Sequence, residues 1–235
     1  MKFCWCGEEK HEVISRGNWR YLHYVLGECQ NCSAIRTIGY DCISSKPAPN
    51  LDLKNAGLGP RHMASLKTIK ENYIDGNLLD VGCGDGKLDQ YIRKNYSGIK
   101  KIKAVEKSRL IFGLMEKIDG IEYGNETILD MNNDEKYENI VSTHCFEHVK
   151  NIVETLQKCE DLSSENAMLY ISVPNVEYVN FTNFLGFSPD EHCWHFTKKS
   201  IRNLLEKVLK EFKIVGFYES KIWDSRDQLE VVLKK

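Results

Sequence analysis

The 235-residue chain lacks a long hydrophobic run, a strong excess of charge of either sign and any internal repeat. No apolar stretch approaches the ~18 residues of a membrane-spanning helix. The first twelve residues, MKFCWCGEEKHE, lack the apolar centre of a signal peptide. The net charge of −2 provides no general basic field for nucleic acid or an anionic membrane. These absences predict a protein of the cytoplasm without a membrane partner.

Proline is scarce, and three of the five prolines fall within SSKPAPNLDLKNAGLGP, residues 44–60. This segment is rich in turn formers and predicts a linker. It separates a cysteine-rich module, residues 1–43, from a longer domain, residues 61–235. The length is sufficient for one α/β core plus such a small accessory module.

From residue 61 onward, strand-like and helix-like segments alternate along the chain. NLLDVG, KIKAVE, IEYG, ENIVSTHC and NAMLYISVP have the character of buried strands, whereas GKLDQYIRKNY, RLIFGLMEKI and SIRNLLEKVLKEF have helical spacing. Thr197 is the expected N-cap of the last of these helices. The alternation predicts an α/β domain with a parallel sheet and helices on both faces.

The stretch NLLDVGCGDGKL, residues 77–88, follows an expected strand and opens an expected helix, where open α/β sheets bind ligands. A phosphate-binding P-loop is excluded, because Leu88 stands where Ser or Thr is required and Val81 where glycine is required. A dinucleotide fingerprint fails at its third glycine, which is Lys87 here.

The charges of this loop indicate another class of ligand. Asp80 and Asp85 flank the turn, which disfavours a pyrophosphate and favours a ligand with positive charge. About twenty residues further on, Glu106 ends a second expected strand, where an acidic side chain binds both hydroxyls of a ribose. The pattern therefore predicts a nucleoside with a cationic tail and no phosphate, which describes S-adenosylmethionine.

Six segments, LLDVGCGDG, AVEKS, GNETI, YENIVSTHCFEHV, ISVPN and HFTKKSIRNLLE, occur in this order. They resemble the motifs of class I S-adenosylmethionine-dependent methyltransferases, in particular the small-molecule branch that includes ubiquinone-type and sugar methyltransferases. The resemblance implies a seven-stranded Rossmann-like sheet whose last strand runs antiparallel, and DQLEVVLKK would supply that strand.

The same resemblance implies roles for individual residues. Gly82 and Gly84 would let the backbone approach the methionine part of the cofactor, and Glu106 would bind its ribose. Asn125 stands where the family usually has Asp, and its amide oxygen would accept a hydrogen bond from the adenine. The implied cofactor contacts are Asp80, Gly82, Gly84, Glu106, Asn125, Glu126 and His144, the last beside the methyl group.

Methyl transfer needs an aligned nucleophile about 3 Å from the methyl group and often a base, for which histidine is suited near neutral pH. The segment THCFEHV offers His144, Glu147 and His148. Similar quinone O-methyltransferases carry Glu-x-x-Glu-His here, a proposed site for a divalent metal that would polarise a substrate hydroxyl. The alternative is that Glu147 and His148 only cap and orient the following helix.

The segment SPDEHCWHFT offers a second pair, His192 and His195, in a loop that lies over the substrate pocket in similar enzymes. One of this pair is the first candidate for the general base, and His148 is another. The aromatic residues before the pair form either a lid on the pocket or part of the core; they are Tyr178, Phe181, Phe184 and Phe187.

Two cysteine pairs, C-x-C and C-x-x-C, stand 22 residues apart in the N-terminal module. Four thiolates from two such knuckles form a closed, tetrahedral, structural zinc site, which would stabilise a module too small to bury a large core. Cys42 or His11 could replace one ligand, and the alternative is a set of reduced thiols in a small sheet. Some sugar methyltransferases begin with a similar zinc-ribbon-like module. The expected zinc ligands are Cys4, Cys6, Cys29 and Cys32.

Three hypotheses remain for the function. The first is a methyltransferase acting on an oxygen or nitrogen of a small molecule, such as a sugar, a nucleotide-linked intermediate or another metabolite. The second is an RNA or protein methyltransferase that grips its polymer with the zinc module, and the third is a cofactor-binding regulator without turnover. The second would use a basic, aromatic surface made of Arg16, Trp19, Arg20, Tyr21, Tyr24, Arg36 and Lys46.

Overall fold

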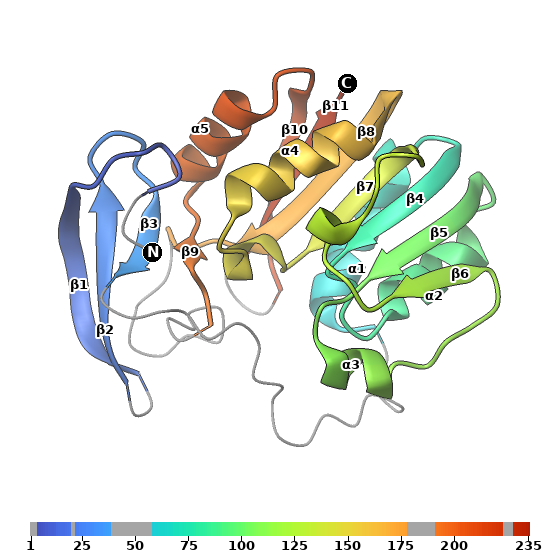
Figure 1. The fold of residues 1–235 in the computed structure, drawn as a ribbon, viewed down its shortest axis with the longest axis horizontal. Coiled ribbons are helices and arrows are strands. Elements are labelled where there is room, and N and C mark those ends of the chain that lie inside the picture. Colours follow the sequence, from blue (N-terminus) through green and yellow to red (C-terminus); the bar gives the residue numbers. More distant parts are fainter. Residues whose placement is uncertain (1–3, 20–21, 39–57, 178–190, 223–227) are drawn as a thin grey trace.

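The structure is a computed structural model that describes residues 4–19, 22–38, 58–177, 191–222 and 228–235 (Figure 1). Two β-sheets organise these residues, a four-stranded one and a seven-stranded one. The strands are β1 (His11–Trp19), β2 (Leu22–Cys29), β3 (Ile35–Ile38), β4 (Gly76–Val81), β5 (Ile99–Val105), β6 (Ile121–Gly124), β7 (Tyr137–Thr143), β8 (Ser163–Pro174), β9 (Trp194–His195), β10 (Lys213–Ser220) and β11 (Gln228–Lys234).

The helices lie between the strands of the larger sheet. The α-helices are α1 (Pro60–Asn72), α2 (Lys87–Asn95), α3 (Arg109–Leu114), α4 (Ile152–Leu162) and α5 (Lys198–Val208), and the short 3-10 helices are η1 (Ile128–Asp130) and η2 (Phe146–His148). None of the helices in the described part of the chain is long and apolar enough to cross a membrane.

The larger sheet has the strand order β10-β11-β8-β7-β4-β5-β6. The strands from β8 to β6 are paired in parallel, and β11 runs antiparallel to both of its neighbours. The predicted α/β fold, with seven strands and an antiparallel last strand, is confirmed.

The two faces of this sheet carry separate hydrophobic cores. On one face, side chains of α4 and α5, such as Leu156 and Leu204, pack with the strands, and Figure 1 shows these two helices side by side over the sheet. On the other face, Ile69 of α1 and Ile92 of α2 do the same. The sheet is therefore buried on both sides, as a parallel sheet requires.

The helix ends follow from local chemistry, with one difference from expectation. Thr197 caps α5, because its hydroxyl accepts a hydrogen bond from the backbone N–H of Ser200. The stretch RLIFGLMEKI, in contrast, is helical only as far as Leu114. Met115 leaves the helix with extended backbone and buries its side chain in the core beneath α2, so tertiary packing overrides helical propensity there.

The four-stranded sheet has the order β1-β2-β3-β9, so its last strand comes from residues far along the chain. The Trp194 side chain on β9 is buried and donates a hydrogen bond to the carbonyl of Val149. Cys4, Cys32 and Trp194 belong to the same hydrophobic cluster as Leu204 of α5. The N-terminal sheet therefore packs directly on the larger domain, and most of the expected linker, residues 44–57, lies outside the described residues.

Asn139 provides a test of the larger sheet. Its side chain is fully buried, accepts from the N–H of Ile74 and donates to the carbonyl of the same residue. Asn139→Leu should lower the free energy of unfolding by about 2–4 kcal/mol, because two backbone groups lose their partners. Urea denaturation measures this change. Asn95→Ala, at an exposed position, is the matched control and should change it by only about 0.5 kcal/mol; equal losses in the two variants would contradict the prediction.

Candidate functional site

A cavity of about 690 Å³ opens at the carboxyl ends of β4, β5 and β7. Parallel strands bring their carboxyl ends to one edge, so the segments after these strands meet there. The glycine loop after β4, Glu106 after β5 and the turn after β7 all line the cavity.

The glycine loop needs its glycines for two different reasons. Gly82 and Gly84 both have positive φ, 77° and 58°, which disfavours any residue with a Cβ atom. A Cβ at Gly82 would lie 2.4 Å from the sulfur of Cys145, whereas a Cβ at Gly84 would meet no atom of the described residues within 4 Å. Gly82 therefore allows close packing, and Gly84 keeps its backbone open to the cavity.

Glu106 lies on the cavity wall directly beside this loop. One carboxylate oxygen accepts from the N–H of Gly84 at 3.1 Å, and the other accepts from the N–H of Ser108 at 2.6 Å. Each oxygen keeps a further lone pair. The carboxylate is thus held in place by the backbone and can still accept hydrogen bonds from two neighbouring hydroxyls.

The two residues expected at the adenine differ in their positions. Glu126 lines the cavity and forms an ion pair with Lys103 at 3.2 Å. Asn125 is exposed and is not among the lining residues that the structure describes. Its side-chain amide donates to the carbonyl of Glu106 at 2.7 Å. Asn125 therefore stabilises the backbone of the segment that carries Glu106.

Asp80 lies beneath the glycine loop and does not line the described part of the cavity. It is fully buried beside Asp89 of α2, and the described residues offer these carboxyl oxygens no other hydrogen-bond partner. Burial raises the pKa of Asp80 to about 7, and burial together with the charge of Asp80 raises the pKa of Asp89. Burial therefore opposes the ionisation of both groups, and Asp85 is the loop acid that lines the cavity.

Two histidines line the cavity on the side of β7. His144 has a left-handed backbone with φ of 50°, and its Nε2 lies 2.7 Å from the amide oxygen of Gln228. His148 has its Nδ1 3.1 Å from the carbonyl oxygen of Glu191. Because a carbonyl can only accept, Nδ1 of His148 carries a proton, and in the neutral imidazole Nε2 is then the nitrogen with the lone pair.

Glu147 is the buried charge between these histidines. One of its oxygens lies 3.4 Å from Nδ1 of His144 and 3.9 Å from Nε2 of His148. Burial opposes its ionisation, but the contacts with His144, His148 and His192 outweigh burial and lower the pKa of Glu147 to about 2. The side chain is therefore a carboxylate that would stabilise a positive charge formed on His144 or His148.

His192 and His195, the first candidates for a base, lie behind the cavity residues that follow β7. Both are buried and neither is among the described lining residues. The His192 ring meets the His148 ring edge to face at 4.7 Å, and His195 bonds to Thr37 of β3. Burial lowers the pKa of His192 and lowers that of His195 to about 3. Their positions suit a supporting role.

The histidine cluster also contains a set of residues that could hold a metal ion. The ligand atoms of Glu147, His148 and His192 lie within 4.8 Å of one another. The sequence predicted His144 as the third ligand of this set, where the structure has His192. The difference arises because His144 turns its Nε2 toward Gln228, while the ring of His192 lies against that of His148.

The four N-terminal cysteines converge as their spacing predicts. The sulfur of Cys4 lies 3.4 Å from that of Cys32, and the sulfur of Cys6 lies 3.5 Å from that of Cys29. A tetrahedron with Zn–S bonds of about 2.3 Å has edges of about 3.8 Å, close to these distances. The hydrogen bond from Cys32 lowers the pKa of Cys4 to about 5. The cluster could hold zinc.

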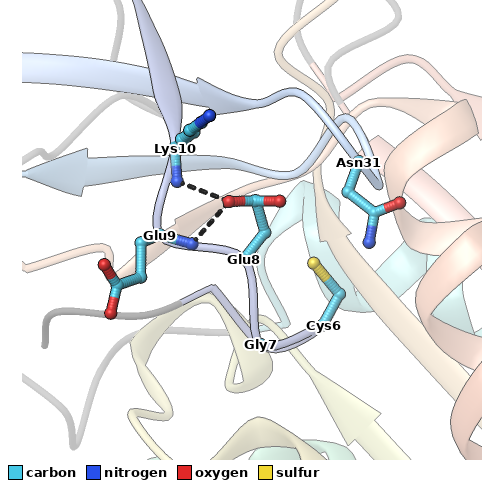
Figure 2. Close-up of a pocket in the computed structure, with 6 residues that line it drawn as sticks. All are labelled: Cys6, Gly7, Glu8, Glu9, Lys10 and Asn31. Carbon is cyan, nitrogen blue, oxygen red and sulfur yellow. Dashed lines mark hydrogen bonds between the residues drawn. The ribbon is translucent and has the colours of Figure 1, made fainter.

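The surroundings of this cluster exclude one alternative ligand. Nδ1 of His11 bonds to the carbonyl of Glu9, and His11 is not part of the converging group; Cys42 lies outside the described residues. Figure 2 shows Cys6 at the border of an open hollow of about 520 Å³, where the Glu8 carboxylate accepts from the N–H groups of Glu9 and Lys10. Glu8 thereby stabilises the knuckle backbone.

The basic and aromatic surface expected for a polymer substrate is not assembled as predicted. Arg36 is only 4% exposed and Tyr24 only 6%, whereas Arg16 is exposed. The side chains of the other four residues of that surface lie outside the description, as do the four aromatic residues of the expected lid.

Sequence reasoning missed two residues of the site. His62 of α1 lines the cavity, and its buried Nδ1 has no hydrogen-bond partner among the described residues. Thr37 of β3 contacts the histidine cluster from the small sheet. Neither position carries a local signal, because each reaches the site only through packing between elements distant in sequence.

Comparison of the chain with known proteins agrees with this geometry. The profile of a family described as a methyltransferase domain matches residues 31–208, more than half of the chain, so the chain belongs to that family. Together with the fold and the cavity, this makes the protein a class I S-adenosylmethionine-dependent methyltransferase. No curated protein gives a significant match.

Solved structures of low sequence identity share the fold. The Burkholderia thailandensis 1,6-didemethyltoxoflavin-N1-methyltransferase is 12% identical, with a TM-score of 0.60, covering 94% of this chain and 99% of its own. The plantazolicin methyltransferase BpumL is 16% identical, with a TM-score of 0.60, covering 75% and 83%. A methyltransferase from Aquifex aeolicus is 16% identical, with a TM-score of 0.59, covering 72% and 88%.

The buried pair beneath the loop predicts a pH dependence. An acid whose pKa is raised by folding keeps its proton while the unfolded chain releases it, so stability falls as the pH rises from about 4 to about 7. Asp89→Asn removes one of the two acids and offers the Asp80 carboxylate an amide donor. The loss of stability between about pH 5 and about pH 8 should shrink by about 1–2 kcal/mol.

Urea unfolding at the two pH values measures this change. Asp119→Asn, at an exposed position on the surface, is the control and should keep the wild-type pH dependence. An unchanged loss of stability in Asp89→Asn would show that the pair does not hold a shared proton.

Proposed function

We propose that this methyltransferase transfers the methyl group of S-adenosylmethionine to an oxygen or nitrogen of a small molecule, with His148 as the general base. The observation that carries the proposal is one cavity lined on one side by the glycine loop and Glu106, and on the other by His148. A cofactor bound by the glycine loop and Glu106 would direct its methyl group toward His148.

The residues on the cofactor side fit S-adenosylmethionine chemically. Glu106 offers two carboxylate oxygens to a pair of ribose hydroxyls, and Gly84 leaves room for close backbone approach. Asp85 and Glu126 give this side of the cavity an acidic character that suits a cationic ligand. When bound, the cofactor supplies an electrophilic methyl group.

His148 has the geometry of a base that is ready to accept a proton. Its Nδ1–H donates to the carbonyl of Glu191, which leaves Nε2 with a lone pair. A proton leaving the acceptor's hydroxyl or amine would move to Nε2, and the buried carboxylate of Glu147 would stabilise the imidazolium that forms. His192 packs against the ring and restricts its orientation.

A metal ion at Glu147, His148 and His192 is the alternative for activating the acceptor, since their ligand atoms are close enough. Such an ion would occupy the lone pair of His148 and polarise the substrate oxygen. Activity that is lost with a chelator and restored by a divalent cation would favour the metal over the free base.

Two observations favour a small molecule over RNA or protein. The formal net charge is −2, and the burial of Arg36 and Tyr24 weakens the basic, aromatic surface that a polymer would need. In structures of similar fold, BpumL binds a triazolic desmethylPZN analogue and the Burkholderia enzyme binds 1,6-didemethyltoxoflavin. We further propose that the four clustered cysteines hold a structural zinc ion, because such a set leaves no open ligand position.

The decisive measurement is a calorimetric titration with S-adenosylhomocysteine, on protein whose zinc content has been measured by elemental analysis. We expect a dissociation constant in the micromolar range and about one zinc per chain. The absence of binding would overturn the proposed function, and the absence of metal would overturn the zinc site alone.

Glu106→Ala tests the cofactor side of the cavity. We expect the affinity for S-adenosylhomocysteine to fall by about tenfold or more, because a charged hydrogen-bond acceptor is lost. The zinc content should stay unchanged. Glu122→Ala is the matched control, because Glu122 on β6 pairs with Lys101 and Lys103 and does not line the described cavity. Equal affinity in wild type and Glu106→Ala would refute the ribose assignment.

His148→Gln tests the acceptor side. Protein incubated with S-adenosylmethionine carrying a tritiated methyl group and a bacterial extract should label the low-molecular-mass fraction. His148→Gln should reduce labelling by about 100-fold while binding S-adenosylhomocysteine normally, and His23→Gln, at an exposed position, should label as wild type does. Label in RNA or protein would instead favour the polymer hypothesis, and unchanged labelling by His148→Gln would exclude His148 as the base.

A further inference from the structure

The four residues from His192 to His195 join the cysteine-bearing sheet to the wall of the cavity. Strand β9 pairs with β3, with Ile35 opposite His195 and Arg36 opposite Trp194. This pairing extends the N-terminal sheet by one strand from the methyltransferase domain. Any displacement of β3 is therefore transmitted to the segment that packs behind the candidate base.

The hydroxyl group of Thr37 makes two contacts where β3 meets the segment from His192 to His195. Its Oγ1 lies 3.2 Å from the carbonyl oxygen of His192 and 3.0 Å from Nε2 of His195. A hydroxyl has a single proton, and the carbonyl can only accept. Thr37 therefore donates to His192 and accepts from the Nε2–H of His195, which selects one tautomer of that imidazole.

The other side of the same segment is bonded to the turn that carries His148. The N–H of Cys193 donates to the carbonyl of Glu147 at 2.7 Å, and the indole of Trp194 donates to the carbonyl of Val149 at 2.8 Å. The ring of His192 contacts the ring of His148. Residues on both sides of His148, and its ring, are thus held by the segment that Thr37 fixes.

The small sheet is itself anchored at the cysteine cluster. Strand β3 begins three residues after Cys32, whose carbonyl accepts from the side chain of Asn203 on α5. The cysteine knuckle, β3, β9 and η2 therefore form one continuous chain of contacts. This chain leads from the cluster to the cavity.

We infer that the cysteine-bearing sheet positions His148 through β9, and that Thr37 is the positioning residue at that joint. The inference rests on the proposed function, because it assigns the sheet a role in the framework of the proposed base. Thr37 does not line the described cavity, so it acts through His192 and His195 and not on the substrate.

The test uses full-length protein labelled with nitrogen-15 at histidine and compares three variants. Long-range proton–nitrogen spectra distinguish the two tautomers of a neutral imidazole. Wild type should show His195 as the Nε2–H tautomer alone. Thr37→Val, which keeps the shape but removes the hydroxyl, should lose this single tautomer and shift the ring signals of His148. Thr37→Ser should restore both, and Thr68→Val, which removes a buried hydroxyl from α1, should leave both unchanged.

Labelling activity and cofactor binding complete the test. In Thr37→Val, the rate of methyl transfer should fall about tenfold while the affinity for S-adenosylhomocysteine changes by less than about twofold, because the base is misplaced and the cofactor side is intact. A Thr37→Val protein with the histidine spectrum of wild type would overturn the inference. So would a wild-type His195 that shows the other tautomer or a mixture, which decides the matter even if the valine variant fails to fold.

The two proposals fail in different ways. If wild type does not bind S-adenosylhomocysteine, the proposed function fails. If wild type binds the cofactor product but the His148 signals do not respond to Thr37→Val, the inference fails and the proposed function stands.

Discussion

The parallel pairing of β4 with β5 and β7 is the constraint on which the site depends. Three segments that are separate in sequence end at the same edge of the sheet only because these strands run in the same direction and register. The open backbone of Gly84, the carboxylate of Glu106 and the ring of His148 thereby share one cavity. The cores on both faces of the sheet hold this register, since a shift by one residue would turn the buried side chains outward.

The buried carboxyl groups on the two sides of this edge are stabilised in different ways. Beneath the glycine loop, Asp80 and Asp89 have no counter-ion among the residues that the structure describes, and burial raises the pKa of each. On the acceptor side, Glu147 is surrounded by imidazoles, and their attraction outweighs burial. The first arrangement limits the negative charge under the loop, and the second maintains a negative charge next to the proposed base.

The small sheet adds a third element to the site. A module of some 40 residues buries little apolar surface by itself, and here it gains a strand and a hydrophobic contact surface from the larger domain. The cysteine cluster is therefore connected to the cavity through β3 and β9. Through these contacts the N-terminal sheet packs on the larger domain.

The sequence by itself determined the α/β fold class and pointed to the cofactor, because hydrophobic periodicity and the glycine loop are local signals. The seven-stranded sheet with its antiparallel last strand and the methyltransferase class followed from the resemblance of six ordered motifs to a known family. It also predicted the two cysteine knuckles, whose four sulfurs converge. Only the tertiary structure decided that Asp80 faces Asp89, that His192 and His195 lie behind His148, and that β9 pairs with β3. These outcomes depend on contacts between residues far apart in the chain, and local spacing carries no information about such contacts.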